Sequence, residues 1–355
     1  MAGLEGLDML MRNLESAYTC PVQAAKHFKL VAEIALASGQ LSRARRLMQL
    51  GNIFKIQAMA RWYNALPEGE GGRGKRFEPR LQVEYTLAVT QLHAGLQTPL
   101  RNVARFPASS PRPRIEIHSI CNYRPDPTSQ TGETCHLLQL SVPNHRAYAE
   151  RHDYKYVLHE ELPLPDREAH YSKMLVIHQA FLSASPPDWV FFIDCDAFFT
   201  DASTSLADIL QTYGASGSTG PHFLVAEDPG GINTGTLLFR RSEWSVSFLE
   251  QVASSQFAVA WDQSMFFWEI LKHGLLGVAD QPERLQADYA WPAEVMLVHQ
   301  AHMNAFVPPA SRDWSAHEWI EGDFIRHFAG CPWQEPHCLG LMRETAKYAE
   351  QRLKS

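Results

Sequence analysis

The fold is decided by the stretch PDWVFFIDCDAFFT, residues 187–200, which joins an apolar segment to two carboxylates. Residues 189–193 are apolar without interruption, a pattern typical of a strand covered on both faces in a parallel α/β sheet. Ligands of such sheets bind beyond the carboxyl ends of the strands, where Asp194 and Asp196 follow. Aspartates are also common in turns, but two unpartnered neighbouring carboxylates would repel each other. The spacing therefore favours a site for one hard cation.

The flanking sequence alternates between strand and helix patterns, which is the signature of a parallel sheet with helices on its faces. Apolar runs of strand length predict strands over residues 115–120, 154–158, 189–193, 223–226, 236–239 and 295–299. Apolar residues at helical spacing predict helices over residues 137–152, 173–184, 244–253, 263–273 and 342–353.

Residues up to about 100 carry helical patterns without a cluster of convergent polar groups. A helix is expected over 24–37, capped by Gly39, and a second begins after Ser42, which together make an αα-hairpin. A third helix is expected over 83–96, after a glycine-rich break at 67–74, and a proline-rich linker follows over 98–113. We expect three parts: a helical packing or interaction module (1–105), a catalytic domain (112–340) and a terminal helix (341–355).

Composition excludes several classes of protein. The 355 residues are 45% hydrophobic, enough for one large domain and a smaller one. A net charge of −7 argues against a nucleic-acid partner. No basic leader, membrane-spanning apolar run or Asn-x-Ser/Thr acceptor occurs, so a cytoplasmic location is expected. The six cysteines lack metal-site spacing and are expected to be free thiols, with Cys195 a small apolar spacer.

Three downstream segments add polar groups that could complete a site. The sequence GGINTG, residues 230–235, predicts a small-residue loop that lets a ligand approach Asn233, although a simple turn has the same composition. Asp262 and Gln263 open a predicted helix, where N-capping alone could account for the aspartate. His327 could be a core residue, but with two carboxylates it would form a site for Mn²⁺ or Mg²⁺ that holds a diphosphate.

Seven motifs together resemble glycosyltransferase family 34, which includes galactosyl-, mannosyl- and xyloglucan xylosyltransferases. The resemblance covers about residues 114–335 and leaves the helical N-terminal region unexplained. In chain order the motifs are NHRAYAERH (144–152), YSKM (171–174), WVFFIDCDAF (189–198), GINTG (231–235), DQS (262–264), NAF (304–306) and EGDFIRHFAGC (321–331).

The resemblance implies a GT-A fold, a nucleotide-sugar donor, a divalent metal and transfer with retention of anomeric configuration. By position, Asp194, Asp196 and His327 resemble the metal ligands, and Asp194 also resembles an aspartate that binds the donor ribose. The residues that resemble those around the transferred sugar are Asn233, Asp262 and Gln263. The implied donor contacts are Ser119, Cys121, Asn122, Lys173 and Gly235.

The family also implies a mechanism, in which the departing phosphate accepts the acceptor's proton while Gln263 stabilises the cationic sugar and Asp262 orients it. A covalent intermediate on Asp262 is an alternative. UDP-galactose or UDP-xylose is the first expectation for the donor and GDP-mannose the next, with a glycan, protein or small molecule as acceptor. Plant members often carry a lysine where this chain has Pro332, so Lys173 or Arg326 would have to meet the diphosphate.

Two other functions remain open from the sequence. A haloacid-dehalogenase-like phosphohydrolase also uses Asp-x-Asp at a strand end, but it requires Thr or Val where Phe198 stands and a late acid where His327 stands. A non-catalytic helical adaptor with a degenerate transferase domain is the second, and it could bind a protein through the N-terminal helices.

Overall fold

The structure is a computed structural model that describes residues 30–32, 34–35, 37–40, 44, 47–48, 51–52, 103–121, 136–164, 169–217, 219–228, 231–255, 257–259, 261–275, 292–307, 317–331 and 336–354. The chain divides into two compact units, each treated by itself. One holds residues 1–98, 229–232 and 255–292, and the other holds residues 99–228, 233–254 and 293–355. The expected break at 67–74, the expected helix at 83–96, Asn122 and Pro332 lie outside the described residues.

The first unit is helical wherever the structure describes it near the N-terminus. Described residues between 30 and 37 are helical, and so are those at 44, 47–48 and 51–52. Gly39 has a φ of 71°, and the Gln40 amide donates to the Ala35 carbonyl at 2.9 Å, which ends the first helix in a left-handed cap. Helix α9 (Trp261–Leu275) belongs to the same unit. The described part of the expected αα-hairpin is therefore helical as predicted.

The second unit is built on a six-stranded mixed sheet in the order β2-β1-β3-β6-β5-β7. Strand β1 pairs in parallel with β2 and β3, whereas β6 runs antiparallel to β3. Every residue of β3 is buried, as its unbroken apolar run predicts. The expected GT-A type of α/β fold is confirmed. The strands are β1 (Ile115–Ile120), β2 (Lys155–His159), β3 (Trp189–Ile193), β5 (Phe223–Asp228), β6 (Gly231–Arg240) and β7 (Val295–Val298).

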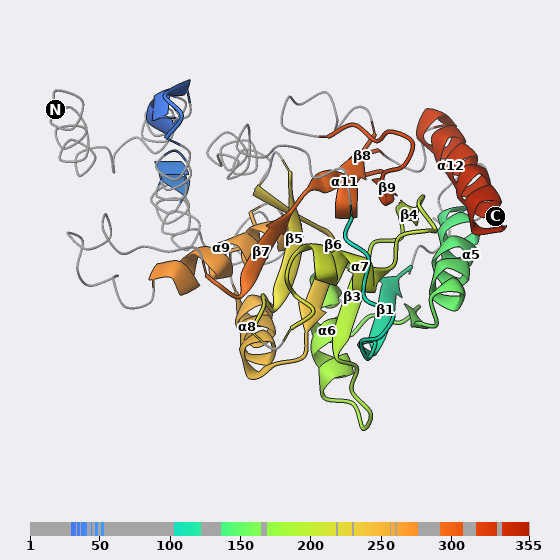
Figure 1. Cartoon of the computed structure of the whole chain (residues 1–355), viewed down its shortest axis with the longest axis horizontal. Coiled ribbons are helices and arrows are strands. Elements are labelled where there is room, and N and C mark those ends of the chain that lie inside the picture. The colour runs from blue at the N-terminus through green and yellow to red at the C-terminus, as the bar shows by residue number, and fades with distance from the viewer. Residues whose placement is uncertain are drawn as a thin grey trace, which may run out of the picture. The chain divides into compact units, whose positions relative to one another are not determined.

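Helices flank this sheet (Figure 1). Contacts join α12 to α5 and α6 to α8, and the aromatic rings of Tyr148 on α5 and Phe199 stack with centroids 3.7 Å apart. Helix α12 begins at Pro336, earlier than expected, because proline suits the first turn of a helix. The helical segments are α5 (His136–Arg151), η2 (Ala169–Ser172), α6 (Lys173–Phe181), α7 (Leu206–Thr212), α8 (Glu243–Ser254), α11 (Gln300–Met303) and α12 (Pro336–Lys354).

A second, three-stranded sheet lies beyond the end of β3. Its order is β4 (Ala197–Phe199), β9 (Ile325–His327) and β8 (Ala305–Phe306). Strands β4 and β9 are antiparallel, with Ala197 opposite His327. The sequence did not predict this sheet, because strands of two or three residues carry no readable alternation. The small sheet brings the late part of the chain beside the residues that follow β3.

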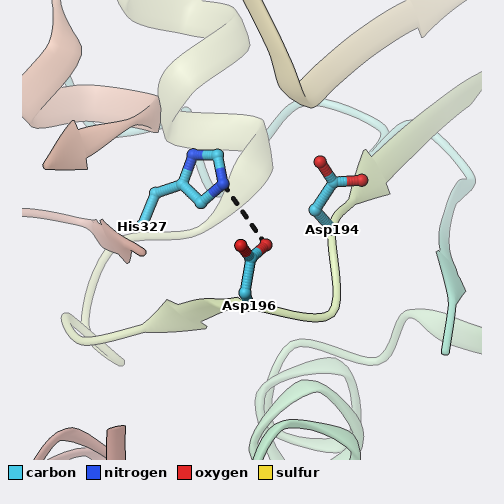
Figure 2. A group of neighbouring side chains, drawn as sticks. All are labelled: Asp194, Asp196 and His327. Carbon is cyan, nitrogen blue, oxygen red and sulfur yellow. Dashed lines mark ion pairs between the residues drawn. The ribbon is translucent and has the colours of Figure 1, made fainter. Parts of the chain in front are cut away.

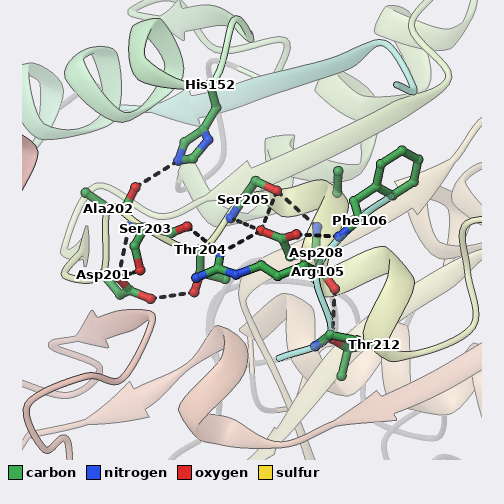
Figure 3. A network of polar contacts seen from close by, with 12 residues as sticks. Arg105, Phe106, His152, Asp201, Ala202, Ser203, Thr204, Ser205, Asp208 and Thr212 are labelled. Carbon is green, nitrogen blue, oxygen red and sulfur yellow. Dashed lines mark hydrogen bonds and ion pairs between the residues drawn. The ribbon is translucent and has the colours of Figure 1, made fainter. Parts of the chain in front are cut away.

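Arg105 and Phe106 bind the N-terminal turn of α7, and the Ala104 amide donates to Thr212 at the other end of that helix (Figure 3). Ser205 and Asp208 form a capping box at that N-terminal turn. The Asp208 carboxylate also accepts from the Phe106 amide at 2.6 Å and from Arg105 Nη1 at 3.1 Å. Burial alone raises the pKa of Asp208, but these donors outweigh it and hold the pKa below its usual value. This part of the expected linker is thereby anchored to the sheet-containing unit.

Two disulfides correct the expectation of free thiols. Cys121 is bonded to Cys195, with their Cα atoms 5.3 Å apart, and Cys331 is bonded to Cys338. Cys195 is consequently a bridging residue and no mere spacer. Spacing along the sequence could not reveal the first pair, because 74 positions separate its members and only the neighbouring places of β1 and β3 bring them together.

Candidate metal and donor site

Three potential metal ligands converge beyond the carboxyl end of β3 (Figure 2). Asp194 directly follows β3, Asp196 directly precedes β4, and His327 is the last residue of β9. One ligand atom from each lies within 4.8 Å of the others, and His327 Nε2 is 3.3 Å from Asp196 Oδ1. The structure thus brings the predicted triad together. Two carboxylates and one imidazole are a donor set that fits Mn²⁺ or Mg²⁺.

The charges of the triad link the protonation of His327 to the binding of an ion. Burial by itself lowers the pKa of His327, but the charge and hydrogen bond of Asp196 outweigh it and raise that pKa above 6.5. Burial by itself raises the pKa of Asp196, but the charge and hydrogen bond of His327 outweigh burial, so that the pKa of Asp196 lies below its usual value. The Asp196 side chain is 24% exposed and that of His327 only 4%, so the carboxylate is partly accessible to solvent while the imidazole is buried. An ion can take the place of the imidazole proton.

Asn304 fixes the orientation of the imidazole. Its Oδ1 atom lies 2.6 Å from His327 Nδ1 and accepts a hydrogen bond from it, which leaves Nε2 directed at Asp196. Such a partner on the second ring nitrogen orients a histidine ligand and selects its tautomer. The sequence contained the signal, since Asn304 lies in one of the family motifs, but no role was assigned to it.

The glycine-rich segment at 231–235 is part of strand β6, which corrects the expectation of a loop. A side chain at Gly235 would place its Cβ 2.2 Å from His327 Cε1 and 2.9 Å from Asn233 Oδ1. The Gly235 carbonyl accepts from the Asp194 amide at 2.7 Å. Gly235 is therefore required because the imidazole lies directly against its backbone.

Asn233 maintains the backbone at the start of β6. Its Oδ1 atom accepts from the Gly235 amide at 2.8 Å, and its Nδ2 atom donates to Asp228 Oδ2 at 3.0 Å. The side chain is buried next to the candidate ligands. Its expected contact with the transferred sugar stays a prediction.

Lys173 places a cation inside the site. The side chain is 1% exposed, and its Nζ atom lies 3.2 Å from Asp194 Oδ1 and 3.0 Å from the Thr234 carbonyl. Arg326 is different, because alternate residues of a strand point to opposite faces. It lies over the Trp319 ring and donates to Thr345, on the face opposite His327. Of the two expected diphosphate partners, only Lys173 lies beside the triad.

For the remaining predicted site residues, the described contacts do not include the three candidate metal ligands. Ser119 is buried in β1, and its Oγ atom is 3.5 Å from the sulfur of Cys121, which is in a disulfide. Asp262 and Gln263 lie in the first turn of α9, which begins at Trp261, so Asp262 is not the cap residue. Because α9 belongs to the other compact unit, the roles of these two residues stay predictions.

Comparison with known proteins adds a family relationship. Residues 120–215 and 209–338 match the profile of the galactosyl transferase GMA12/MNN10 family. A probable α-1,6-mannosyltransferase, MNN10 of Saccharomyces cerevisiae, is 25% identical over 237 residues, covering 58% of each chain. A probable α-1,2-galactosyltransferase, gmh2 of Schizosaccharomyces pombe, is 24% identical over 241 residues, covering 58% of this chain and 63% of its own. The match thus spans about three fifths of these relatives.

Solved structures resemble the chain more distantly. A glycosyltransferase involved in glycosylation of the major capsid of PBCV-1 has a TM-score of 0.43 at 15% identity, covering 67% of this chain and all of its own. Mouse xyloside xylosyltransferase 1 has a TM-score of 0.38 at 10% identity, covering 61% of this chain and 98% of its own.

Proposed function

Because the chain belongs to the galactosyl transferase GMA12/MNN10 family, we propose that it transfers a hexose or pentose from a nucleotide-diphosphate sugar to an acceptor hydroxyl. The transfer retains the anomeric configuration and forms an α-glycosidic bond. A UDP-sugar is the favoured donor, and GDP-mannose belongs in the same test because one relative is named as a probable mannosyltransferase. The cytoplasmic location and a protein partner for the N-terminal helices stay predictions. Within the described residues, no helix is both long and apolar enough to cross a bilayer.

The observation that carries the proposal is the convergence of Asp194, Asp196 and His327, which come from segments far apart in the sequence. These three residues would hold Mn²⁺ or Mg²⁺. When bound, such an ion neutralises charge that develops on a leaving diphosphate. Lys173, buried beside Asp194, adds a fixed positive charge to the same place.

The chain's own residues supply orientation and electrostatics. Asn304 holds the His327 ring, and Gly235 leaves the space that the ring occupies. Asn233 is proposed to contact the transferred sugar from the start of β6. Asp262 and Gln263 are proposed to orient that sugar and stabilise its positive charge, while the leaving phosphate accepts the acceptor's proton. Ser119, Cys121 and Asn122 are proposed to line the nucleotide pocket.

A donor screen tests this proposal. The protein is incubated with Mn²⁺ and, one at a time, UDP-galactose, UDP-xylose and GDP-mannose, and the released nucleoside diphosphate is measured. We expect release from one donor, and loss of that release in Asp196→Ala. Asp188→Ala is the matched control, because Asp188 precedes β3 in the same stretch and should leave release unchanged.

Other outcomes would reject the proposal. Hydrolysis of a phosphomonoester without donor preference would indicate a phosphohydrolase, and silence in both assays would indicate the non-catalytic adaptor. Where transfer is seen, the proton NMR coupling at the new anomeric centre reports retention, and a β product from an α-linked donor would contradict it.

A further inference from the structure

The turn that carries both carboxylates is also the end of a disulfide. Cys195 stands between Asp194 and Asp196, and its sulfur is bonded to Cys121, the residue after β1. Both cysteines are buried in an apolar cluster that also contains Phe198 and Phe328. The covalent bond therefore acts directly on the segment that presents two of the three candidate metal ligands.

The bridge continues the pairing of β1 with β3 beyond its last backbone pair. That last parallel pair is His118 with Phe192, and three residues further along each strand come Cys121 and Cys195. The two strands thus stay together where their backbone ladder has ended. The amide of Cys121 also donates to the His159 carbonyl of β2 at 3.3 Å, so the anchor on the β1 side is itself held by the sheet.

The backbones of the two carboxylate residues are held from other directions. The Asp194 amide donates to the Gly235 carbonyl at 2.7 Å, and the Asp196 carbonyl accepts from the Phe328 amide at 3.0 Å. These contacts tie the turn to β6 and to the residue after β9. Only the disulfide, among the contacts described for this turn, ties its central residue to β1. Without the bridge, the central residue of the turn would lose its covalent link to the end of β1, and the position of the two carboxylates would depend on noncovalent contacts.

From this geometry we infer that the Cys121–Cys195 disulfide is a positioning element for the metal site, and that the oxidised chain binds divalent metal more tightly than the reduced chain. The inference rests on the proposed function, because it assumes that Asp194 and Asp196 hold an ion. Preorganised ligands bind with a smaller ordering cost. Since disulfides persist mainly in oxidising compartments, the place where the chain folds would set the affinity of the site.

An added dithiol can reduce the Cys121–Cys195 disulfide. Two electrons and two protons pass from the dithiol to the two sulfurs, which become thiols, and the dithiol becomes a disulfide. Because the sulfurs are buried, exchange needs transient opening of the cluster. We therefore expect reduction of the native protein to be slow and its effect on metal affinity to follow the fraction of opened bridges.

Paired cysteine variants test the inference. Cys121→Ala with Cys195→Ala should weaken Mn²⁺ binding at least about tenfold, measured by electron paramagnetic resonance titration. Cys331→Ala with Cys338→Ala is the matched control, because it removes the other disulfide of the same apolar cluster and should change Mn²⁺ affinity less than about twofold. Both pairs should lower the melting temperature, so stability alone does not separate them.

Reduction of the wild-type protein provides a second measurement should the variant not fold. Dithiothreitol should weaken Mn²⁺ binding and reoxidation should restore it, while peptide mapping follows the link between Cys121 and Cys195. Unchanged Mn²⁺ affinity after complete reduction, or no such link in the oxidised protein, would overturn the inference. A wild-type chain that transfers sugar but shows equal affinity in both states leaves the proposed function standing. A wild-type chain that binds neither Mn²⁺ nor Mg²⁺ overturns both.

Discussion

Two aspartates of the sheet-containing unit, Asp208 and Asp196, occupy opposite kinds of environment. Asp208 is surrounded by fixed donors of the fold, namely the amides of Phe106 and Ser205, the Ser205 hydroxyl and Arg105. Asp196 faces an imidazole that can lose its proton, and its side chain is 24% exposed compared with 8% for Asp208. The difference shows how a carboxylate can serve either the chain itself or a bound ion. Both have a lowered pKa, so that property alone does not distinguish them.

The largest expected effect comes from removing the charge of Asp196, the more exposed of the two aspartates. Asp196→Asn should weaken Mn²⁺ binding at least about 100-fold, because it removes a charged ligand rather than a residue that merely orients one. At a pH above the raised pKa of His327, the free energy of unfolding of the metal-free protein should change by less than about 1 kcal/mol, because the imidazole is then neutral with or without the Asp196 charge. Isothermal titration and urea unfolding measure the two quantities. A variant that keeps its Mn²⁺ affinity would place the ion elsewhere.

Substitution of Asp208, the more buried aspartate, should instead lower stability and leave Mn²⁺ affinity unchanged. Asp208→Ala removes a capping box and the anchor of residues 103–106, so it should lower the free energy of unfolding by about 2 kcal/mol. Urea unfolding checks this effect. Mn²⁺ affinity should remain that of the wild type, and a parallel loss of affinity would show that the two regions are coupled.

An intermediate loss of Mn²⁺ affinity is expected when Asn304, which binds the ligand His327 but is not itself a ligand, is replaced. Asn304→Ala removes the acceptor for His327 Nδ1 without touching any ligand atom. We expect Mn²⁺ affinity to fall about tenfold, the lower end of the range for partners of metal-binding histidines. Asn304→Asp should restore much of it, because a carboxylate also accepts from Nδ1. Equal affinity in all three proteins would assign Asn304 a purely structural role.

The last prediction concerns the pH dependence of Mn²⁺ affinity. In the metal-free protein Asp196 raises the pKa of His327 above 6.5, so an entering ion must displace a proton at any pH below that raised value. Mn²⁺ affinity should therefore rise with pH, by at most about tenfold per unit, and level off once the imidazole is neutral. Titrations between pH 5.5 and 8.5, an interval of about 3 units, would show this trend. His327→Asn should flatten it, and a fall in affinity with rising pH would contradict the proposed ligand.

The strongest sequence signals were continuous in the chain. The apolar run of β3 and the carboxylates after it predicted both the buried strand and the place of the site. His327 could be proposed as a ligand only because the two carboxylates and the family motif pointed to it, since β9 is three residues long and has no periodicity of its own. The two disulfides were missed because contact between Cys121 and Cys195 is a property of neighbouring strands rather than of local sequence.

The glycine-rich segment shows a different limit of sequence patterns. Glycines at 231 and 235 suggested a loop, yet both lie in β6, where Gly235 leaves room for an imidazole. A small residue can mark either a bend or the close approach of another group, and the sequence does not distinguish them. Similarly, N-capping was the alternative explanation for Asp262, but this residue lies within the first turn of α9, which begins at Trp261.

The pairing of β4 with β9 also has a consequence for biosynthesis. As the polypeptide leaves the ribosome, Asp194 and Asp196 emerge long before His327, and Ala197 has no β9 partner until residues 325–327 have been made. A nascent chain that stops short of this point can complete most of the large sheet but cannot assemble all three ligands. Any shortened translation product that ends before residue 325 should thus be unable to form the complete ion-binding group.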